Sequence, residues 1–421
     1  MDKQGNENIR SVCLKILNEV FDGGYLNLVL KKHLRSVSLS SRPFLTALAS
    51  VAIEKKISID YYLSPFISGK RVKGNIKNIL RMAVAQIMYL NVPEYTAVDE
   101  AVKLSRIYGR KQAGFVNAVL RTFLRKERRS LPDENDLSAY LSIKYSFPEW
   151  MVKTFINDMG INRATEFLSY EADNKSTYVY DNPLKTSKAD LKSYPPYARE
   201  VKSITDVENI EEFISGKMSV MGISSMKAVY AVYNAESSAL DVCAAPGAKT
   251  AYLAALSGGK AFITACDIHL HRIKLIKENL SRLGVDARVL YRDASVTYED
   301  PLKKEHFDLV LVDAPCSALG MVFKKPDIRI HRKEEDIISL AEVSRQILDA
   351  SALRVKRGGR LAFLTCTVTK AENEDTVNWF LKRNPDFKLV SIDINGETDI
   401  MHTMMPSQDG EGFFVCLMEK V

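Results

Sequence analysis

The sequence predicts a multidomain protein with an all-α N-terminal domain, a small α+β subdomain and a C-terminal α/β domain built on a doubly wound, Rossmann-like sheet. The chain has 421 residues, more than one domain usually holds. Residues 1–130 carry only helical periodicity, whereas from about residue 216 short apolar runs alternate with helical patterns. Such alternation is typical of a parallel sheet covered by helices on both faces.

The composition is that of an ordinary globular protein, with 46% hydrophobic and 26% charged residues. The first ten residues are polar and show no signal-peptide pattern, and no apolar run reaches the roughly 18 residues of a membrane span. The six cysteines are scattered without a CxxC pair, which favours reduced thiols over disulfides or zinc. We therefore expect a cytoplasmic protein with no metal, no membrane contact and no obligate protein partner.

Positive charge is concentrated in the first third of the chain. Residues 1–130 hold 23 Lys and Arg against 10 Asp and Glu, a net charge of +13, while the remainder has a net charge of −6. A basic block attached to a near-neutral body is typical of a protein that binds a polyanion. The alternative is a helical surface that is merely solvated.

Three stretches of residues 1–130 show clear helical periodicity. Apolar residues recur at helical spacing over 9–20, 76–90 and 115–123, and Pro93 ends the second pattern. Cys13 lies on the first apolar face, so we expect a core thiol there and not a reactive one.

A polar, Pro-containing stretch at 131–136 is the expected linker to the next domain. We place the small α+β subdomain at 137–215, with a strand at 177–180. The C-terminal domain then occupies 216–421.

Five strands and four helices alternate in the predicted C-terminal domain. The strands are expected at 239–243, 261–267, 287–291, 307–313 and 360–366. The helices are expected at 249–256, 271–283, 334–355 and 372–383. Two apolar segments, at 387–392 and 413–420, come last without a clear helix between them and predict a closing hairpin.

Two of these strands end in a cysteine. One apolar run leads into Asp-Ala-Pro-Cys, which ends at Cys316, and another leads through a threonine into Cys366. Ligands of open α/β sheets bind outside the carboxyl ends of the strands, so two thiols and the Asp313 carboxylate are expected at one mouth. A strand-end cysteine can also be a small buried apolar residue, which we expect of Cys266 and Cys416.

The first strand of this domain runs into a turn of small residues and then a helix, at 244–250. Such a turn lets the backbone approach a ligand, and a helix N-terminus presents free N–H groups. Asp267, 20 residues after Gly247, matches the offset at which an acid binds ribose hydroxyls, and Asp293 ends the third strand. Each carboxylate alone could cap a turn, but acids at successive strand ends favour a nucleoside-bearing cofactor without a demanding phosphate.

Segment 92–121 resembles the RNA-binding helical domain of the NusB antitermination family, most specifically through FVNAVLR at 115–121. It is similar to the copy of this domain that precedes a catalytic domain in bacterial ribosomal RNA methyltransferases. The resemblance implies that the basic N-terminal domain binds RNA.

The C-terminal motifs resemble those of the RNA 5-methylcytosine methyltransferases, in particular the ribosomal group that carries a NusB-like domain (the Sun/RsmB type). The matching segments are DVCAAPGAKT at 241–250, Asp267, Asp293, DAPCSALG at 313–320, KPDI at 325–328, TCT at 365–367, Glu372-Asn373 and QDGEGFF at 408–414. The resemblance implies S-adenosyl-L-methionine as the cofactor. The residues implied to bind it are Cys243, Ala244, Ala245, Pro246, Gly247, Ala248, Lys249, Asp267, Arg272, Asp293 and Asp313.

The resemblance also implies a reaction, on a cytosine of small-subunit (16S) ribosomal RNA. Carbon 5 of cytosine is too weak a nucleophile to take a methyl group unaided, and addition of a thiolate to carbon 6 activates it. The cysteine of the family's TC motif attacks, here Cys366, and that of its PC motif assists product release, here Cys316. Asp313 is expected to hydrogen-bond the cytosine. Lys249 is a candidate for lowering the pKa of Cys366, because a nearby cation favours a thiolate.

Three sites depart from the family pattern. Ala248 replaces a glycine, Ala318-Leu319 replaces Gly-Thr, and Met221-Gly222 replaces a Gln-acid pair. These changes bear on substrate geometry and on activity.

Two alternatives stay open. One is a non-catalytic RNA-binding module with a decayed methyltransferase domain. The other is the same chemistry on transfer RNA or on DNA. The DNA enzymes attack with the cysteine of the PC motif, so a covalent adduct at Cys316 would favour them.

Overall fold

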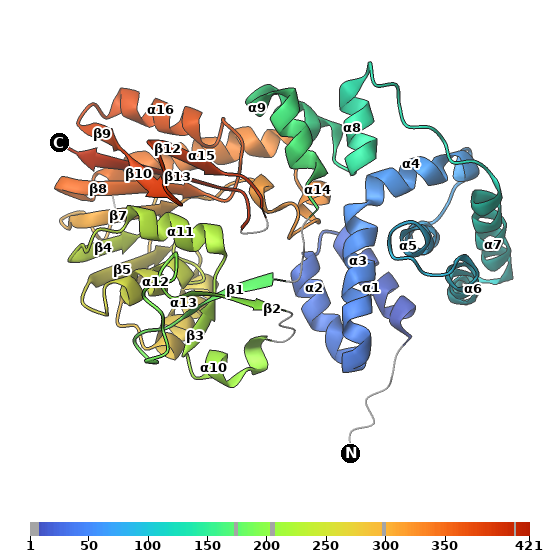
Figure 1. The fold of residues 1–421 in the computed structure, drawn as a ribbon, viewed down its shortest axis with the longest axis horizontal. Helices are drawn as coiled ribbons and strands as arrows, with labels where there is room; N and C mark the ends of the chain where they lie inside the picture. Colours follow the sequence, from blue (N-terminus) through green and yellow to red (C-terminus); the bar gives the residue numbers. More distant parts are fainter. Residues whose placement is uncertain (1–7, 172–175, 203–206, 297–299, 408–409) are drawn as a thin grey trace. The chain divides into compact units, whose positions relative to one another are not determined.

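The computed structural model describes residues 8–171, 176–202, 207–296, 300–407 and 410–421 (Figure 1). The chain forms two compact units. The first comprises Met1–Ser169 and Lys325–Arg332, and the second comprises Tyr170–Lys324 and Lys333–Val421. No helix in the described ranges is long and apolar enough to cross a membrane.

The regular secondary structure described in the first unit is all helical, as predicted for 1–130, and the apolar faces of α1 to α7 form one core. Cys13 is fully buried in this core, and burial raises the pKa of its thiol, so the expected core thiol is confirmed. The helices of this unit are α1 (Ile9–Phe21), α2 (Leu26–His33), α3 (Arg42–Glu54), α4 (Lys56–Ile67), α5 (Gly74–Tyr89), α6 (Glu94–Ser105), α7 (Arg110–Arg125), α8 (Leu137–Tyr145), α9 (Glu149–Ser169) and α14 (Ile328–His331), with 3₁₀ turns at Leu34–Ser36, Leu39–Ser41 and Arg106–Tyr108.

The segment Lys325–Arg332 is part of the first unit although it comes late in the chain. The Asp327 carboxylate accepts a hydrogen bond from the backbone N–H of Leu26 (3.2 Å), the first residue of α2. The buried Arg329 guanidinium donates to the carbonyl oxygens of Tyr145 and Ser146, each at 3.3 Å. Through these hydrogen bonds, the segment that contains the polar motif KPDI is held against the helices of the first unit.

The second unit is built on a sheet of eight described strands in the order β12-β13-β8-β7-β4-β5-β6, with β9 also paired to β13. The pairings among β4 to β8 are parallel, and those of β13 with β8, β9 and β12 are antiparallel. The strands are β4 (Ser238–Asp241), β5 (Phe262–Asp267), β6 (Arg288–Tyr291), β7 (Phe307–Asp313), β8 (Val355–Thr365), β9 (Phe387–Val390), β12 (Met401–Met404) and β13 (Phe413–Lys420).

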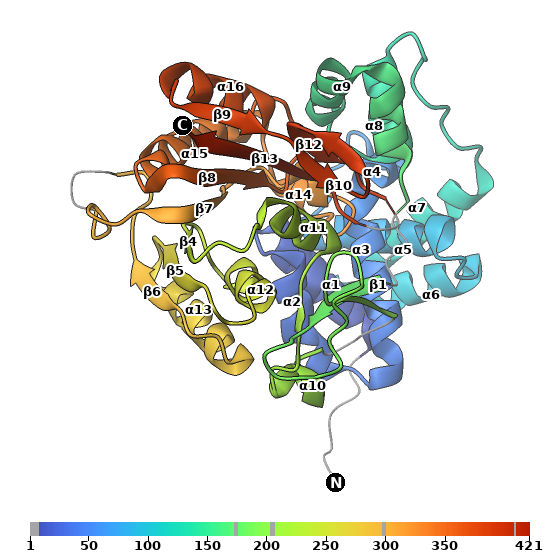
Figure 2. The ribbon, with the colours of Figure 1, turned by 60° about the vertical axis from the view of Figure 1, so that its left-hand side comes forward.

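Helices cover both faces of this sheet, which confirms the predicted doubly wound fold (Figure 2). Along β7, Leu309 and Leu311 join the core on one face, and Val310 and Val312 join the core on the other. Burial on both faces is why the parallel strands are continuous apolar runs. One core includes α11 (Ile223–Val232), α12 (Ala248–Leu256) and α13 (Leu270–Leu283), and the other includes α15 (Glu334–Ala352) and α16 (Glu374–Arg383).

The predicted closing hairpin is wrong in its connection. β9 and β13 do pair antiparallel, but a hairpin of β10 (Ile392–Ile394) and β11 (Glu397–Asp399), followed by β12, lies between them. Asn395 and Gly396 turn this hairpin with positive φ angles of 58° and 83°. An Asn-Gly pair is a strong hairpin signal, but here an apolar, alternating run precedes it and only polar residues follow it, so the sequence analysis predicted no hairpin at this position.

Three further strands of the second unit form a small antiparallel sheet in the order β2-β1-β3. They are β1 (Ser176–Asp181), β2 (Ala198–Lys202) and β3 (Met218–Val220). The second unit also contains α10 (Glu211–Ile214) and 3₁₀ turns at Val207–Asn209 and Leu319–Met321. The expected subdomain at 137–215 spans both compact units, because α8 and α9 belong to the first unit and this sheet to the second. The three domain boundaries therefore stay a prediction.

The second unit contains a buried ion pair between Arg292 and Asp300. The side chains of Arg292 and Asp300 are 1% and 2% exposed and form two hydrogen bonds of 2.8 Å. We expect Arg292→Leu to lower the free energy of unfolding by about 3–5 kcal/mol, because it removes two hydrogen bonds from a buried carboxylate and leaves the more distant Arg354, 3.7 Å away, as its cationic partner. Urea denaturation of the full chain measures this loss. Arg292→Lys keeps a cation beside Asp300 and should lose less stability, and an equal loss in both variants would contradict the prediction.

Candidate active site

The two cysteine-bearing loops leave neighbouring parallel strands at the same edge of the sheet. β7 and β8 pair with Asp313 opposite Leu364, so Cys316 follows the end of one strand and Cys366 follows the end of the other. The two Sγ atoms lie 3.4 Å apart although 50 residues separate them in the chain. The structure thus brings together the two thiols that the sequence analysis paired.

The environment of Cys316 keeps a proton on this thiol. Its side chain is only 9% exposed. Its hydrogen bond with Cys366 and its burial raise the pKa of Cys316 well above the ordinary value. Two thiols in such contact titrate as a pair, so ionisation of one makes the other a hydrogen-bond donor.

A charged pair stands at the same edge. The Lys249 ammonium, in the first turn of α12, lies 2.5 Å from Oδ2 of Asp313, and both side chains are partly buried. Burial lowers the pKa of Lys249, but the charge and hydrogen bond of Asp313 raise it more, so the net shift is upward. Lys249 therefore keeps its positive charge, and it also interacts electrostatically with Cys366.

The turn after β4 is held against the end of β5. The Ala244 N–H donates to the carbonyl oxygen of Cys266 at 2.8 Å, and the Gly247 N–H donates to that of Ala244 at 2.5 Å. Gly247 precedes α12 with φ +98°, in the left-handed region that favours glycine. Ala245, Pro246 and Ala248 complete a turn made of small side chains.

Burial raises the pKa of the thiols of Cys243, Cys266 and Cys416, with Cys266 at about 12. Cys266 and Cys416 are fully buried, which confirms the expectation of small core residues. Asp241, under the turn, accepts a 2.7 Å hydrogen bond from Thr250, and burial raises its pKa to about 7.

The predicted series of acids lies at successive strand ends. Asp267 ends β5 and its side chain is 5% exposed. One of its oxygens accepts the His269 N–H at 2.9 Å, and the other lies 4.0 Å from Arg272 Nη1. Asp293 follows β6 and accepts the N–H and the hydroxyl of Ser295, at 2.9 and 2.6 Å. Both carboxylates are thus held in place at the carboxyl ends of two neighbouring strands.

A cluster of buried polar residues next to the cysteines was not predicted. Ser317 and Thr367 directly follow Cys316 and Cys366, and both hydroxyls contact the carboxylate of Glu372. In the sequence, Glu372 stands out only as part of a motif shared with the family. A hydroxyl residue after each cysteine was the signal that could have indicated the cluster.

The departures from the family pattern have local structural consequences. Ala318 adopts φ +61°, a left-handed conformation that a glycine would adopt without strain. A Cβ atom on Gly222 would collide with the Glu411 carboxylate, so that carboxylate fills the space that an acidic side chain would need at position 222. Gln408 and Asp409 of the last motif lie outside the described residues.

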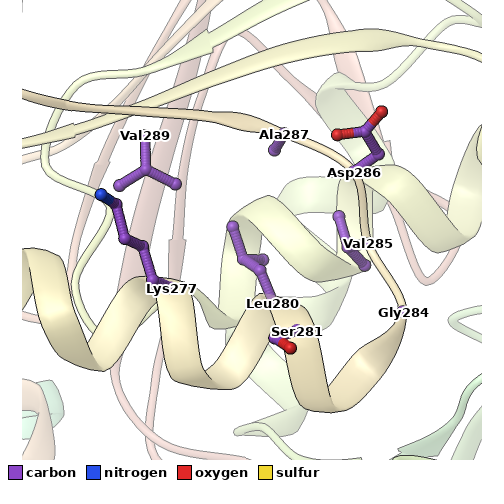
Figure 3. Close-up of a pocket in the computed structure, with 8 residues that line it drawn as sticks. All are labelled: Lys277, Leu280, Ser281, Gly284, Val285, Asp286, Ala287 and Val289. Atoms are coloured by element: carbon purple, nitrogen blue, oxygen red, sulfur yellow. The ribbon is translucent and has the colours of Figure 1, made fainter.

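A hollow in the second unit lies elsewhere. It measures about 420 Å³ and lies between α13 and the segment that enters β6, where Lys277, Gly284 and Asp286 line it (Figure 3). This is the amino end of β6, whereas Asp293 follows its carboxyl end. The hollow therefore does not belong to the site formed by the cysteines and the acids.

Two family descriptions match the chain. Residues 229–419 match the family described as 16S rRNA methyltransferase RsmB/F, and residues 7–125 match the NusB family. Among curated proteins, the probable ribosomal RNA small subunit methyltransferase B of Bacillus subtilis (strain 168) is 33% identical, and the match covers 98% of this chain and 99% of that protein. The ribosomal RNA small subunit methyltransferase B of Photorhabdus laumondii subsp. laumondii is 30% identical over the same shares.

Solved structures show the same fold. The crystal structure of PH0851 matches with a TM-score of 0.82 at 23% identity, covering 100% of this chain and 99% of that one. NSun6 from Pyrococcus horikoshii with SFG matches with a TM-score of 0.57 at 20% identity, covering 66% and 99%.

A relative at 33% identity over nearly the whole of both chains, together with the match of both domains, places this protein in a family. The chain belongs to the ribosomal RNA small subunit methyltransferase B family.

Proposed function

We propose that this protein transfers the methyl group of S-adenosyl-L-methionine to carbon 5 of a cytosine in small-subunit (16S) ribosomal RNA, through a covalent bond between Cys366 and the base. As a member of its family, the chain is a methyltransferase that acts on ribosomal RNA with S-adenosyl-L-methionine as cofactor. The choice of base and atom and the covalent step are the proposal. The observation that carries it is the 3.4 Å separation of the Cys316 and Cys366 sulfur atoms at a strand-end site.

The residues at the carboxyl ends of β4, β5 and β6 fit this cofactor. The fixed carboxylate of Asp267 suits ribose hydroxyls, with Arg272 beside it, and that of Asp293 suits the adenine edge. The turn of small residues from Cys243 to Lys249 suits the methionine end, and Asp313 the region of the methyl group. When bound, the cofactor supplies an electrophilic methyl group.

In the first step, the Cys366 thiolate donates an electron pair to carbon 6 of the cytosine, and carbon 5 becomes enamine-like. Cys316 donates a hydrogen bond to the attacking sulfur across the 3.4 Å contact. The Asp313 carboxylate, paired with Lys249, accepts a hydrogen bond from the exocyclic amino group and orients the ring. Carbon 5 would then bond to the methyl carbon as the bond between that carbon and the cofactor's sulfur breaks.

The family resemblance implies attack by Cys366 and product release by Cys316, and the contact between the two thiols supports this order. Once Cys366 carries the base as a thioether, it no longer accepts a strong hydrogen bond or bears charge. The hydrogen bond with Cys366, which is the largest cause of the raised pKa of Cys316, is thereby lost. Cys316 then loses its proton to solvent and takes the proton of carbon 5. The electrons of that C–H bond restore the double bond and expel the Cys366 thiolate, so the thiol pair returns to its starting state with one proton released.

The N-terminal helices supply the proposed RNA contacts. Arg110, Arg121 and Arg125 lie on one exposed face of α7, opposite the face that packs in the core. Such a stripe binds phosphate groups without reading the base sequence. The target cytosine must leave its stack to reach the cysteines.

The proposal also includes the domain boundaries 1–130, 137–215 and 216–421 and a cytoplasmic location.

Trapping the covalent bond tests the proposed function. Cys316→Ala, incubated with 16S ribosomal RNA and the cofactor, should accumulate a protein–RNA adduct on a denaturing gel, because release is blocked after attack. Cys366→Ala should form none, and the wild type should show far less.

An adduct at Cys316 in the Cys366→Ala variant would reverse the two roles, as in the DNA enzymes. Methyl transfer to transfer RNA alone would overturn the ribosomal substrate. If the wild type neither forms an adduct nor methylates any RNA, the non-catalytic RNA-binding module is the better explanation.

The charge of Lys249 should set the pH dependence of attack. Lys249→Met removes a cation that interacts with Cys366, so the rising limb of the single-turnover pH–rate profile should move up by about one pH unit or more. Lys249→Arg keeps the charge and is the matched control. An unchanged profile in Lys249→Met would exclude Lys249 from this role.

The α7 stripe should govern the salt dependence of RNA binding. In Arg121→Glu/Arg125→Glu, we expect the slope of log affinity against log salt concentration to fall by about one for each phosphate group that the variant no longer binds. Filter binding of 16S ribosomal RNA between low and physiological salt measures this slope. Lys274→Glu/Lys277→Glu makes the same charge change on the exposed side of α13 and should leave the slope nearly unchanged. Equal effects of the two variants would show that net charge, and not the stripe, drives binding.

A further inference from the structure

The Glu372 carboxylate lies between the two cysteine-bearing loops and is 1% exposed. It follows β8 and precedes α16, so its backbone belongs to the loop of Cys366. A carboxylate buried this deeply requires hydrogen-bond donors around it. The identity of these donors indicates what the residue does.

Glu372 binds the residue that follows each cysteine. The backbone N–H of Ser317 donates to Oε1 at 2.6 Å, and the Ser317 hydroxyl donates to Oε2 at 2.6 Å. The hydroxyls of Thr367 and Thr369 donate to Oε2 at 3.1 and 2.7 Å. One carboxylate therefore joins the loop after β7 to the loop after β8.

The two loops also contact each other around this carboxylate. The hydroxyls of Ser317 and Thr367 lie 2.9 Å apart. Behind Cys366, the neighbouring Asn373 accepts a hydrogen bond from the Thr365 hydroxyl at 2.5 Å and donates to the Thr367 carbonyl oxygen at 3.1 Å. The backbone on both sides of Cys366 is thus held by adjacent residues.

Burial raises the pKa of Glu372, and its hydrogen bonds with Ser317, Thr369 and Thr367 lower it by less than burial raises it. Without these donors, the buried carboxylate would have no compensation for its burial. The carboxylate and the two loops therefore stabilise one another, and the loops cannot separate without exposing or neutralising it.

We propose that Glu372 is a positioning residue that fixes the separation of the Cys316 and Cys366 thiols by binding Ser317 and Thr367 at once. In the wild type, this separation allows Cys316 to donate its hydrogen bond to the sulfur of Cys366. The catalytic consequence rests on the proposed function, whereas the separation of the thiols can be measured without any turnover.

Phenylarsine oxide is a suitable probe of this separation in the full-length protein. Its arsenic atom forms one bond to each of two adjacent thiols, and its oxygen leaves as water with both thiol protons. The wild type should bind the probe through Cys316 and Cys366, and Cys316→Ala and Cys366→Ala define the background from other cysteines. Glu372→Gln keeps the volume of the side chain but loses the charge that its donors bind, so the affinity for the probe should fall about tenfold or more.

Asp308→Asn is the matched control. The Asp308 carboxylate likewise accepts a backbone N–H and two hydroxyls, from Ser237 and Ser238, but at the amino end of β7. This variant should bind the probe as the wild type does, even if both variants lose stability. Equal probe affinity in Glu372→Gln and the wild type would overturn the proposal.

If Glu372→Gln does not fold, a second pair of variants still tests the proposal. Ser317→Ala and Thr367→Val each remove one link and should weaken probe binding less than Glu372→Gln. If neither changes it, the proposal fails. In single turnover, Glu372→Gln should slow release of the adduct with little change in the affinity for RNA. If the wild type methylates no RNA while probe binding still depends on Glu372, the proposed function fails and the positioning role stands.

Discussion

The parallel pairing of β7 with β8 is the constraint on which the rest of the site depends. With Asp313 opposite Leu364, both strands end at the same edge of the sheet, and their loops start side by side. β7 is apolar on both faces, so a slip of one residue would exchange the side chains between two cores that are both already filled. The register is therefore strongly determined, and the 3.4 Å contact of Cys316 with Cys366 follows from it.

The order of the strands places the charged groups where the thiols need them. β4 pairs with β5 on one side and with β7 on the other, so the chain reverses its direction of winding between β4 and β7. Such a switch point leaves a crevice at the carboxyl ends of the strands. Lys249 reaches this crevice from the first turn of α12 and Asp313 from the end of β7. Partial burial strengthens their interaction, so a cation is fixed beside the cysteine pair.

Local patterns were sufficient for much of this architecture. The apolar runs before Cys316 and Cys366, and the alternation of strands with helices, predicted a doubly wound sheet with its site at the strand ends. The misses have physical reasons. β8 begins at Val355, before the predicted 360, because Val355 already pairs with Phe307 of β7, and a polar segment with two glycines forms an irregularity before regular pairing resumes at Arg360. The helix predicted from residue 372 begins at Glu374, because the side chains of the two preceding residues bind the loop of Cys366.

The sequence by itself determined which residues could meet, because hydrophobic periodicity places residues on strands or helices and the parallel order brings strand ends to one edge. The motifs around the two cysteines and the acids at 267 and 293 were visible in this way. Only the tertiary structure decided how these groups contact one another. The thiol separation, the pairing of Lys249 with Asp313 and the four donors around Glu372 each join segments that are distant in the chain or that no period relates. Such contacts depend on side-chain packing in three dimensions, which a one-dimensional pattern does not contain.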